Sequence, residues 1–232
     1  MGNNTSSAHA LSLLKVPLGH HHSVMVYADE VATRRENPGS EIEVMDEAEK
    51  LLCPIDPEGG VVALAVWPGA IELSIALVSS SINFSQARIL EIGCGVGLPG
   101  ISLAKYFGPK EVVLSDRGSA RTSVEASIAS NNQQNVCRFE TFDWGSSTDL
   151  KTFSSTTFDY IIGSEIVYAE EQAPLINALL AVSSSASHPR IILSYRNRSE
   201  ADESYFNSEI LKYFKIEEKI SENIFIFSRK LV

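Results

Sequence analysis

The residues best suited to chemistry lie in segment 88–97, where an apolar run and one acidic residue precede three glycines in alternate positions. Glycine permits positive φ angles, and its missing Cβ lets a backbone turn approach a ligand closely. The pattern therefore predicts a nucleoside-binding turn after a strand. Glu91 narrows the choice, because a carboxylate at such a turn would repel the pyrophosphate of a dinucleotide. S-adenosylmethionine carries no phosphate, and its sulfonium and ammonium groups attract a carboxylate directly or through water.

Polar residues also follow two later strands that the sequence predicts. Ligands of open parallel sheets bind beyond the carboxyl ends of the strands. Asp116 follows a strand at 111–115, where its carboxylate can accept hydrogen bonds from both ribose hydroxyls, although NAD would use it equally. Asp143 and Trp144 follow the next strand and offer an acceptor for an adenine amino group and an aromatic surface for its ring. Taken alone, Trp144 is equally typical of an ordinary core residue.

A fourth strand end carries Ser164, Glu165 and Tyr168. Glu165 and Tyr168 are three residues apart, so one helical turn would place both on the side that faces the crevice. A carboxylate beside an aromatic ring can accept hydrogen bonds from an amine and bind its cationic form. The alternative is that Glu165 caps the following helix while Tyr168 packs on it. These residues alone leave both interpretations open.

The elements that must position these residues alternate between strand and helix. Strands are predicted at 24–27, 61–66, 88–92, 111–115, 136–139, 158–163, 190–195, 214–220 and 224–229, and helices at about 71–79, 98–107, 118–131, 171–185 and 200–213. The Ser/Thr-rich segment 146–157 is predicted to be a loop. Because residues 221–223 form a tight connection, the last two strands should make an antiparallel hairpin. This order predicts an α/β fold with a doubly wound, mostly parallel sheet and an antiparallel addition at one side.

The 232 residues suggest one large domain with an N-terminal extension. We expect a disordered tail at 1–23, an extension that covers the cofactor at 24–86, and a core at 87–232. The first six residues fit the pattern for myristoylation of Gly2, which would give weak, reversible membrane attachment because no basic cluster lies nearby. An unmodified tail is the alternative.

Composition excludes some functions. The net charge of −10 argues against nucleic-acid binding and suits either a lysine-rich partner or simply a solvated surface. Cys53, Cys94 and Cys137 lack metal-ligand spacing and indicate a reducing, cytoplasmic environment, with Cys94 packed inside the turn. His20 to His22 have no acidic or cysteine partner at motif spacing, so no metal site is predicted. No apolar run reaches the ~18 residues of a membrane-spanning helix.

Taken in order, these residues resemble the S-adenosylmethionine-dependent protein-lysine methyltransferases with a seven-strand Rossmann-like sheet, and in particular methyltransferase family 16. The resemblance covers roughly 60 to 230 and is carried by Trp67-Pro68 and by segments 90–100, 115–117, 143–144, 158–168 and 192–196. It implies cofactor contacts from Trp67, the turn at 93–95, Asp116, Trp144 and Ser164. With the residues argued above, the predicted cofactor-binding set is Trp67, Glu91, Gly93, Cys94, Gly95, Gly97, Asp116, Asp143, Trp144 and Ser164.

The resemblance also implies an acceptor site formed by Glu165 and Tyr168. Members of the family typically have Asp-x-x-Tyr here, whereas this chain has glutamate as the first residue. The charge is kept but the carboxylate moves by one methylene, and a related histidine-methylating member has a similar motif. We expect a protein methyltransferase that acts on lysine, with Glu165 orienting the amine and Tyr168 bounding its channel. Histidine or small-molecule methylation, and a non-catalytic scaffold with the same fold, remain alternatives.

Overall fold

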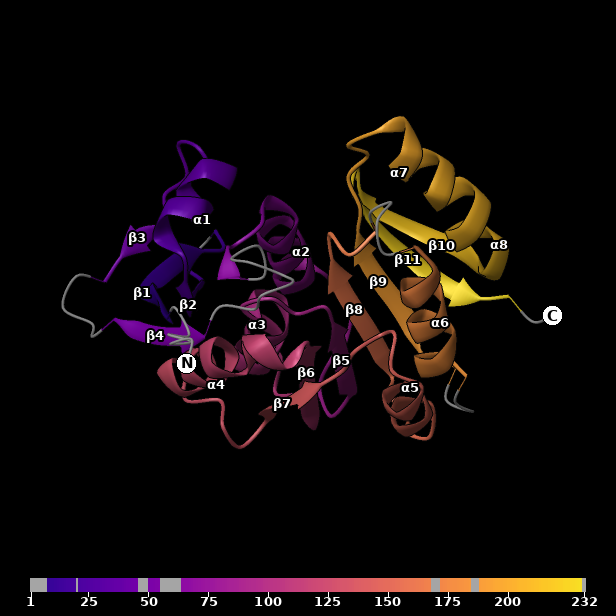
Figure 1. Cartoon of the computed structure of the whole chain (residues 1–232), viewed down its shortest axis with the longest axis horizontal. Helices are drawn as coiled ribbons and strands as arrows, with labels where there is room; N and C mark the ends of the chain where they lie inside the picture. Colours follow the sequence, from indigo (N-terminus) through magenta and orange to yellow (C-terminus); the bar gives the residue numbers. More distant parts are fainter. Residues whose placement is uncertain are drawn as a thin grey trace, which may run out of the picture.

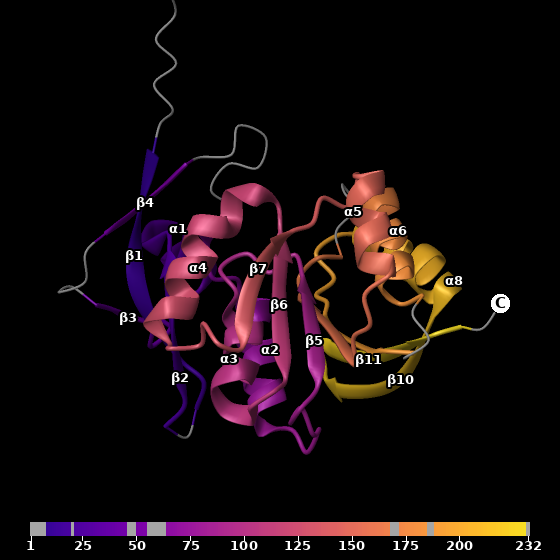
Figure 2. The ribbon, with the colours of Figure 1, turned by 90° about the horizontal axis from the view of Figure 1, so that it is seen from below.

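The computed structural model describes residues 8–19, 21–45, 50–54, 64–167, 172–184 and 188–230. Its elements form four layers (Figure 1 and Figure 2). A small antiparallel sheet lies at one end. Helices lie between it and a seven-stranded sheet, and other helices cover the far face of that sheet.

The seven-stranded sheet has the order β10-β11-β9-β8-β5-β6-β7. Its strands are β5 (Arg88–Ile92), β6 (Glu111–Asp116), β7 (Cys137–Thr141), β8 (Tyr160–Ser164), β9 (Arg190–Ser194), β10 (Phe214–Ser221) and β11 (Ile224–Arg229). β5 to β9 run parallel, and the β10–β11 hairpin is antiparallel. The predicted fold class is therefore confirmed. The strand order reverses between β5 and β8, which is where doubly wound sheets bind ligands.

Helices cover both faces of this sheet, so its parallel strands are buried and read as nearly continuous apolar runs. On one face lie α2 (Pro68–Ser79), α3 (Leu98–Phe107), a short 3₁₀ turn (Gly118–Ala120) and α4 (Arg121–Ser130). On the other lie α5 (Ser147–Ser154), α6 (Gln172–Val182), α7 (Glu200–Tyr205), a π-helical turn (Phe206–Ile210) and α8 (Leu211–Tyr213). Each face has its own cluster of buried apolar side chains.

The small sheet is built around β1 (Ala8–Pro17), which pairs with β2 (Ser23–Ala28), β3 (Glu43–Val44) and β4 (Leu51–Pro54). Helix α1 (Glu30–Glu36) follows β2 and begins at Asp29, whose side chain accepts a hydrogen bond from Ala32 N. The predicted disordered tail at 1–23 is wrong for β1 and the start of β2. Leu14, Val16 and Leu18 alternate with less buried residues and pack into the core, the period-two pattern of a half-buried strand.

The outer edge of β2 is covered by helical side chains. Met25 N donates to Asn131 Oδ1 at 3.1 Å, and Tyr27 N donates to Ser127 Oγ at 2.8 Å. Buried backbone groups need such partners. Apolar residues of β1 and β2 also belong to the same buried cluster as β5 and α3. The N-terminal extension therefore shares the core of the methyl-donor-binding half that the sequence predicts, and it adds a small separate cluster around Leu11 and Leu64.

Other local predictions need correction. The segment expected to be a loop at 146–157 contains α5, and Ser146 caps it by accepting from Asp149 N at 3.2 Å. Residues 64–66, expected at the end of a strand, are not in one, and 61–63 lie outside the described residues. Residues 165–167 form no helical turn. No helix in the described part of the chain is long and apolar enough to span a membrane.

Candidate active site

The glycine turn follows β5 at the carboxyl edge of the sheet. Gly93, Gly95 and Gly97 have φ angles of 63°, 52° and 80°, in the left-handed region that favours glycine. At Gly93 the surrounding space also requires glycine, because an added Cβ would lie 2.7 Å from Ile166 Cγ2 and 3.1 Å from the Trp144 ring. The turn is therefore closed tightly against the residues that follow β7 and β8.

Glu91 is completely buried beneath this turn. Its Oε2 accepts a hydrogen bond from Gly100 N in the first turn of α3, at 2.8 Å, and its Oε1 has no hydrogen-bond partner among the described residues. Burial raises the pKa of Glu91 to about 8, although the hydrogen bond from Gly100 N lowers it. The nearby charge of Asp116 adds to the rise. The carboxyl group therefore supports the turn through the start of α3, and its expected attraction to the ligand, directly or through water, stays a prediction.

Asp116 ends β6 beside the turn. Its Oδ2 accepts from Gly95 N at 2.7 Å, and its Oδ1 accepts from Arg117 N at 2.7 Å. The side chain is half-buried, so its carboxylate stays at the edge of the crevice. This is the position in which a carboxylate can reach ribose hydroxyls of a nucleoside held by the turn.

The Asp143-Trp144 pair follows β7, and its geometry explains how the indole is held. Asp143 Oδ1 accepts from Gly145 N at 2.8 Å, which forms a tight turn around the tryptophan. Trp144 is half-buried with its ring against Gly93. Cys94 is buried and burial raises the pKa of its thiol well above the ordinary value, which suits a packing role.

The structure thus brings Gly93, Gly95, Asp116 and Trp144 together from three strand ends. A backbone turn without Cβ atoms, a carboxylate at its side and a flat indole above it match the sugar and base of a nucleoside. No phosphate-binding cation is part of the set. The residues present therefore fit S-adenosylmethionine.

Glu165 follows β8 and has an unusual backbone. Its φ of 53° lies in the left-handed region, which is rare for residues other than glycine. Its N–H donates to Ser194 O at 3.1 Å and lies 3.2 Å from Ser194 Oγ, so β9 holds this conformation. Residues 165–167 do not form the helical turn expected there, and the pairing of Glu165 with Tyr168 stays a prediction. Tyr168 itself lies outside the described residues.

The Glu165 carboxylate points at the start of α2, and its side chain is only 5% exposed. Gly69 N donates to its Oε1 at 2.8 Å. A Cβ on Gly69 would lie 2.3 Å from Glu165 Cγ, so glycine is needed for this approach. Glu165 therefore caps a helix, as the alternative interpretation held, but the helix is α2 and not the following one.

Two arginines after β9 complete this cluster, and the sequence analysis missed both. Arg198 forms an ion pair with Glu165 Oε2 and lies over the Trp67 ring, 5.3 Å from its centroid. Arg196 forms an ion pair with Glu72 of α2 and places Nε 3.9 Å from Glu165 Oε1. The rule that ligands bind at strand ends could have found them, since they follow the fifth parallel strand as the other candidates follow theirs. We call Trp67, Gly69, Glu165, Arg196 and Arg198 the Glu165 cluster.

The two groups of residues adjoin. Ile166 packs on Gly93 of the glycine turn. Glu165 is the residue directly before Ile166, so the two groups are neighbours. Ser164 ends β8 between them, opposite Ser194 of β9. The nucleoside-type site and a buried carboxylate therefore lie next to each other at the carboxyl edge of the sheet.

Comparison with known proteins identifies the family. A family model described as lysine methyltransferase matches residues 48–211. The chain belongs to this family. It is therefore an S-adenosylmethionine-dependent protein-lysine methyltransferase, which confirms the function, enzyme class and methyl donor that the resemblance implied.

Individual relatives agree with this assignment. Protein N-lysine methyltransferase METTL21A of Danio rerio is 31% identical and covers 68% of this chain and 71% of its own. The protein of the same name from Xenopus tropicalis is 35% identical over 62% of this chain and 65% of its own. EEF1A lysine methyltransferase 3 of Xenopus tropicalis is 28% identical, with 70% of both chains covered.

Solved structures show the fold alone. RosA of Streptomyces davawensis, an N,N-8-amino-8-demethyl-D-riboflavin dimethyltransferase, matches with a TM-score of 0.51 and 13% identity over 69% of this chain. The mitomycin 7-O-methyltransferase MmcR matches with a TM-score of 0.53 and 12% identity over 70% of this chain. The present chain spans about half the length of each of these two proteins, 54% in both cases.

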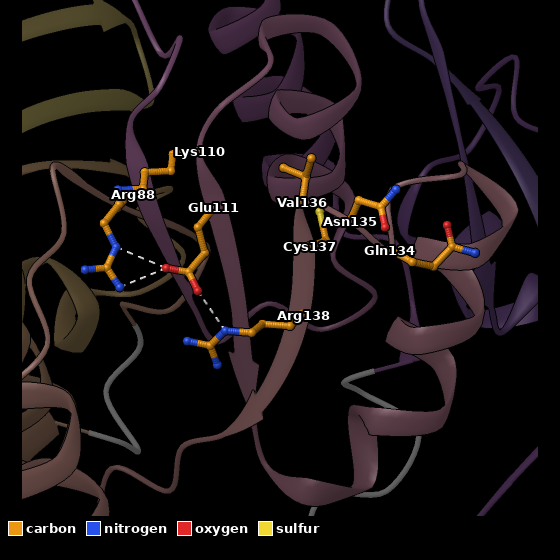
Figure 3. Close-up of a pocket in the computed structure, with 8 residues that line it drawn as sticks. All are labelled: Arg88, Lys110, Glu111, Gln134, Asn135, Val136, Cys137 and Arg138. Carbon is orange, nitrogen blue, oxygen red and sulfur yellow. Dashed lines mark hydrogen bonds and ion pairs between the residues drawn. The ribbon is translucent and has the colours of Figure 1, made fainter.

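A hollow of about 460 Å³ lies at the opposite end of the strands (Figure 3). It is lined by Arg88, Lys110, Glu111, Gln134, Asn135, Val136, Cys137 and Arg138. Arg88, Glu111 and Cys137 begin β5, β6 and β7, so this hollow lies at the amino ends, away from the glycine turn. Figure 3 shows Arg88 and Arg138 directed at Glu111 from the neighbouring strands. This hollow is not part of the candidate active site.

Proposed function

We propose that the methyltransferase modifies a lysine of a protein substrate in the crevice between the carboxyl ends of β5 and β8, with Glu165 at the acceptor amine. One observation supports this most strongly. A carboxylate that is 5% exposed adjoins a nucleoside-type turn through Ile166, so a group able to hold an amine lies beside the methyl donor's site.

The proposal gives each predicted cofactor residue a role. Gly93, Gly95 and Gly97 form the turn beneath the nucleoside, with Cys94 packed inside it. Asp116 binds the ribose hydroxyls, and Asp143 holds the turn that presents Trp144 to the adenine. Glu91 acts through α3 and the turn rather than on the ligand directly. Ser164 and Trp67 border the methyl donor, and Trp67 belongs to the segment at 24–86 that we propose as the cover of the site.

S-adenosylmethionine supplies an electrophilic methyl group, which is transferred in line to the amine with S-adenosylhomocysteine as leaving group. The chain's own residues supply position, because both reactants must be held in near-attack geometry. A lysine amine must also lose a proton, since its reference pKa is ~10.4. Glu165 orients the amine, Tyr168 bounds its channel, and water removes the proton. No full general-base role is proposed for Glu165, because a carboxylate is a weak base toward an ammonium group.

The partner is proposed to be an intracellular protein that presents a lysine, and the enzyme is proposed to be located in the cytoplasm. The chain's net charge of −10 suits such a basic partner and disfavours nucleic acid. The name of one relative carries EEF1A, which makes EEF1A the first substrate to test. Acylation of Gly2 with weak, reversible membrane attachment is a separate proposal on residues outside those described.

The test is incubation of the purified chain with labelled S-adenosylmethionine and either EEF1A or a cell lysate, followed by mass-spectrometric site mapping. We expect label on a specific lysine. Label on histidine alone, or only on small molecules, would contradict the proposed acceptor. The Asp116→Ala variant is the control, because weaker binding of the methyl donor should reduce its labelling at low donor concentration.

A further inference from the structure

Arg198 occupies a place that is built for a cation. Its guanidinium lies between the Glu165 carboxylate and the face of the Trp67 ring, 5.3 Å from the centroid. A carboxylate and an aromatic face are the two groups that bind an ammonium ion in proteins. A lysine ammonium that approached Glu165 would compete for both.

The two arginines of the Glu165 cluster differ in how firmly they are held. Arg196 is bound by Glu72, which also accepts from Asn223 Nδ2 at 3.2 Å, so it belongs to a network that joins α2 to the β10–β11 hairpin. Both arginines lie in the irregular segment between β9 and α7, with similar side-chain exposures of 36% and 40%, so the difference lies in the Glu72 network that holds Arg196. Removal of the Arg198 guanidinium from Glu165 requires adjustment of a loop rather than of a core element.

We propose that Arg198 is the gate of the acceptor site, filling the cation position between Glu165 and Trp67 until a substrate lysine displaces it. The inference rests on the proposed function, because it takes Glu165 as the residue that holds the acceptor amine. Arginine is a suitable stand-in. Its guanidinium stays protonated in proteins, so it can pair with Glu165 without becoming an acceptor of the methyl group itself.

The gate also determines which acceptors enter. The Glu165 charge is balanced while the gate is closed, so an isolated amine gains little by replacing one cation with another. A protein that offers further contacts can offset that exchange. The apparent affinity for the substrate is the affinity of the open form multiplied by the fraction of molecules whose gate is open. A gate closed in about nine molecules of ten therefore weakens substrate affinity about tenfold. Arg198 therefore sets specificity toward large substrates.

The first test reads occupancy without methyl transfer. Binding of n-butylammonium chloride, which mimics the end of a lysine side chain, is titrated by NMR in the presence of S-adenosylhomocysteine. We expect Arg198→Ala to bind this ion at least tenfold more tightly than the parent, and Arg198→Ala/Glu165→Gln to lose the gain. Equal binding by parent and Arg198→Ala would overturn the gate.

A matched control comes from the other end of the sheet. Arg138 is also a half-exposed arginine paired with a carboxylate, at 2.9 Å from Glu111, and its side chain is 44% exposed. Arg138→Ala should bind n-butylammonium as the parent does. A gain equal to that of Arg198→Ala would show that any vacated ion pair attracts the probe, and it would also overturn the gate.

The second test uses the substrate mapped in the previous experiment. Arg198→Ala should lower KM for that protein about tenfold with kcat within about twofold. A fall in kcat at unchanged KM would make Arg198 a positioning residue and overturn the gate. If no lysine is methylated but n-butylammonium binds as expected, the gate stands and the acceptor assignment fails, so the two failures are distinguishable.

Discussion

Two glutamates at opposite ends of the parallel sheet are each flanked by two arginines. At the amino end, Glu111 lies 2.9 Å from Arg88 and 2.9 Å from Arg138, and its side chain is 25% exposed. At the carboxyl end, Glu165 contacts Arg198 and Arg196, and its side chain is 5% exposed. The charged groups are alike, but their surroundings are not.

The differences lie in the backbone and in what else approaches. Glu111 is an ordinary strand residue at the start of β6. Glu165 has a left-handed φ of 53°, a helix N–H on its carboxylate and a glycine whose absence of Cβ makes that approach possible. Residues in such conformations cost about 1–3 kcal/mol each and persist where the surroundings enforce them. The comparison therefore separates a surface ion-pair network from a constrained site.

The largest effect should follow from Glu165→Gln. The amide keeps the shape and the acceptor for Gly69 N but removes the charge that orients the amine. Methylation should fall ten- to thousandfold, which corresponds to ~1.4 to 4 kcal/mol of transition-state stabilisation. Affinity for S-adenosylmethionine should change little. The measurements are initial rates on the mapped substrate and calorimetric titration of the methyl donor.

Glu111→Gln is the matched control for this variant, because it removes the same charge from between two arginines. Its methylation rate should equal that of the parent. Parental rates in both variants would mean that Glu165 merely caps α2, and the proposed acceptor site would be wrong. Glu165→Asp restores the usual family residue and tests whether the longer side chain sets the choice between lysine and histidine.

A smaller effect is expected for Asp116→Ala. Its carboxylate accepts from Gly95 N and is placed for the ribose hydroxyls, so the variant should bind S-adenosylmethionine about 1–3 kcal/mol more weakly, the cost of unsatisfied polar partners. Calorimetry with S-adenosylhomocysteine measures this change, and NAD should bind to neither protein. An unaltered titration would remove Asp116 from the methyl-donor site.

The sequence predicted the fold and the nucleoside half of the site more fully than the acceptor half. The glycine turn, Asp116 and Trp144 follow strands whose apolar runs are unambiguous, so their meeting at one edge follows from parallel pairing. The contact of Gly69 with Glu165 could not be predicted this way. It joins residues far apart in the chain and depends on a left-handed φ that sequence favours only for glycine and a few polar residues.

The other misses also have physical causes. β1 was concealed by polar, serine- and histidine-rich sequence on either side, although the strand itself is mostly apolar and its buried positions alternate as in any half-buried strand. α5 was concealed because serine and threonine are typical of loops, yet the same residue types supply its N-cap at Ser146. The complete burial of Glu91 could not be predicted from the sequence, because it depends on how α3 packs over the turn.

Glu91 provides the third prediction, which concerns pH. Its folded-state pKa of about 8 lies above the ordinary value of 4.5, so its contribution to stability is full below pH 4.5 and is lost as pH rises through 8. The slope can reach ~1.4 kcal/mol per pH unit. Glu91→Gln should remove it. Urea unfolding at pH 5, 6.5 and 8 measures the difference, and parallel profiles for parent and variant would contradict the buried, neutral carboxyl group.

The smallest effect should come from Glu111→Gln on stability. Burial raises the pKa of Glu111, but hydrogen bonds from Arg138 and Arg88 outweigh it and lower the pKa overall. The stabilisation is therefore present above pH 4.5 and is lost as pH falls through the lowered value, the opposite of Glu91. At neutral pH the variant should lose no more than about 1 kcal/mol, and 1 M salt should reduce the difference by screening. A larger, salt-insensitive loss would mean that Glu111 is as constrained as Glu165, and the contrast between the two ends of the sheet would fail.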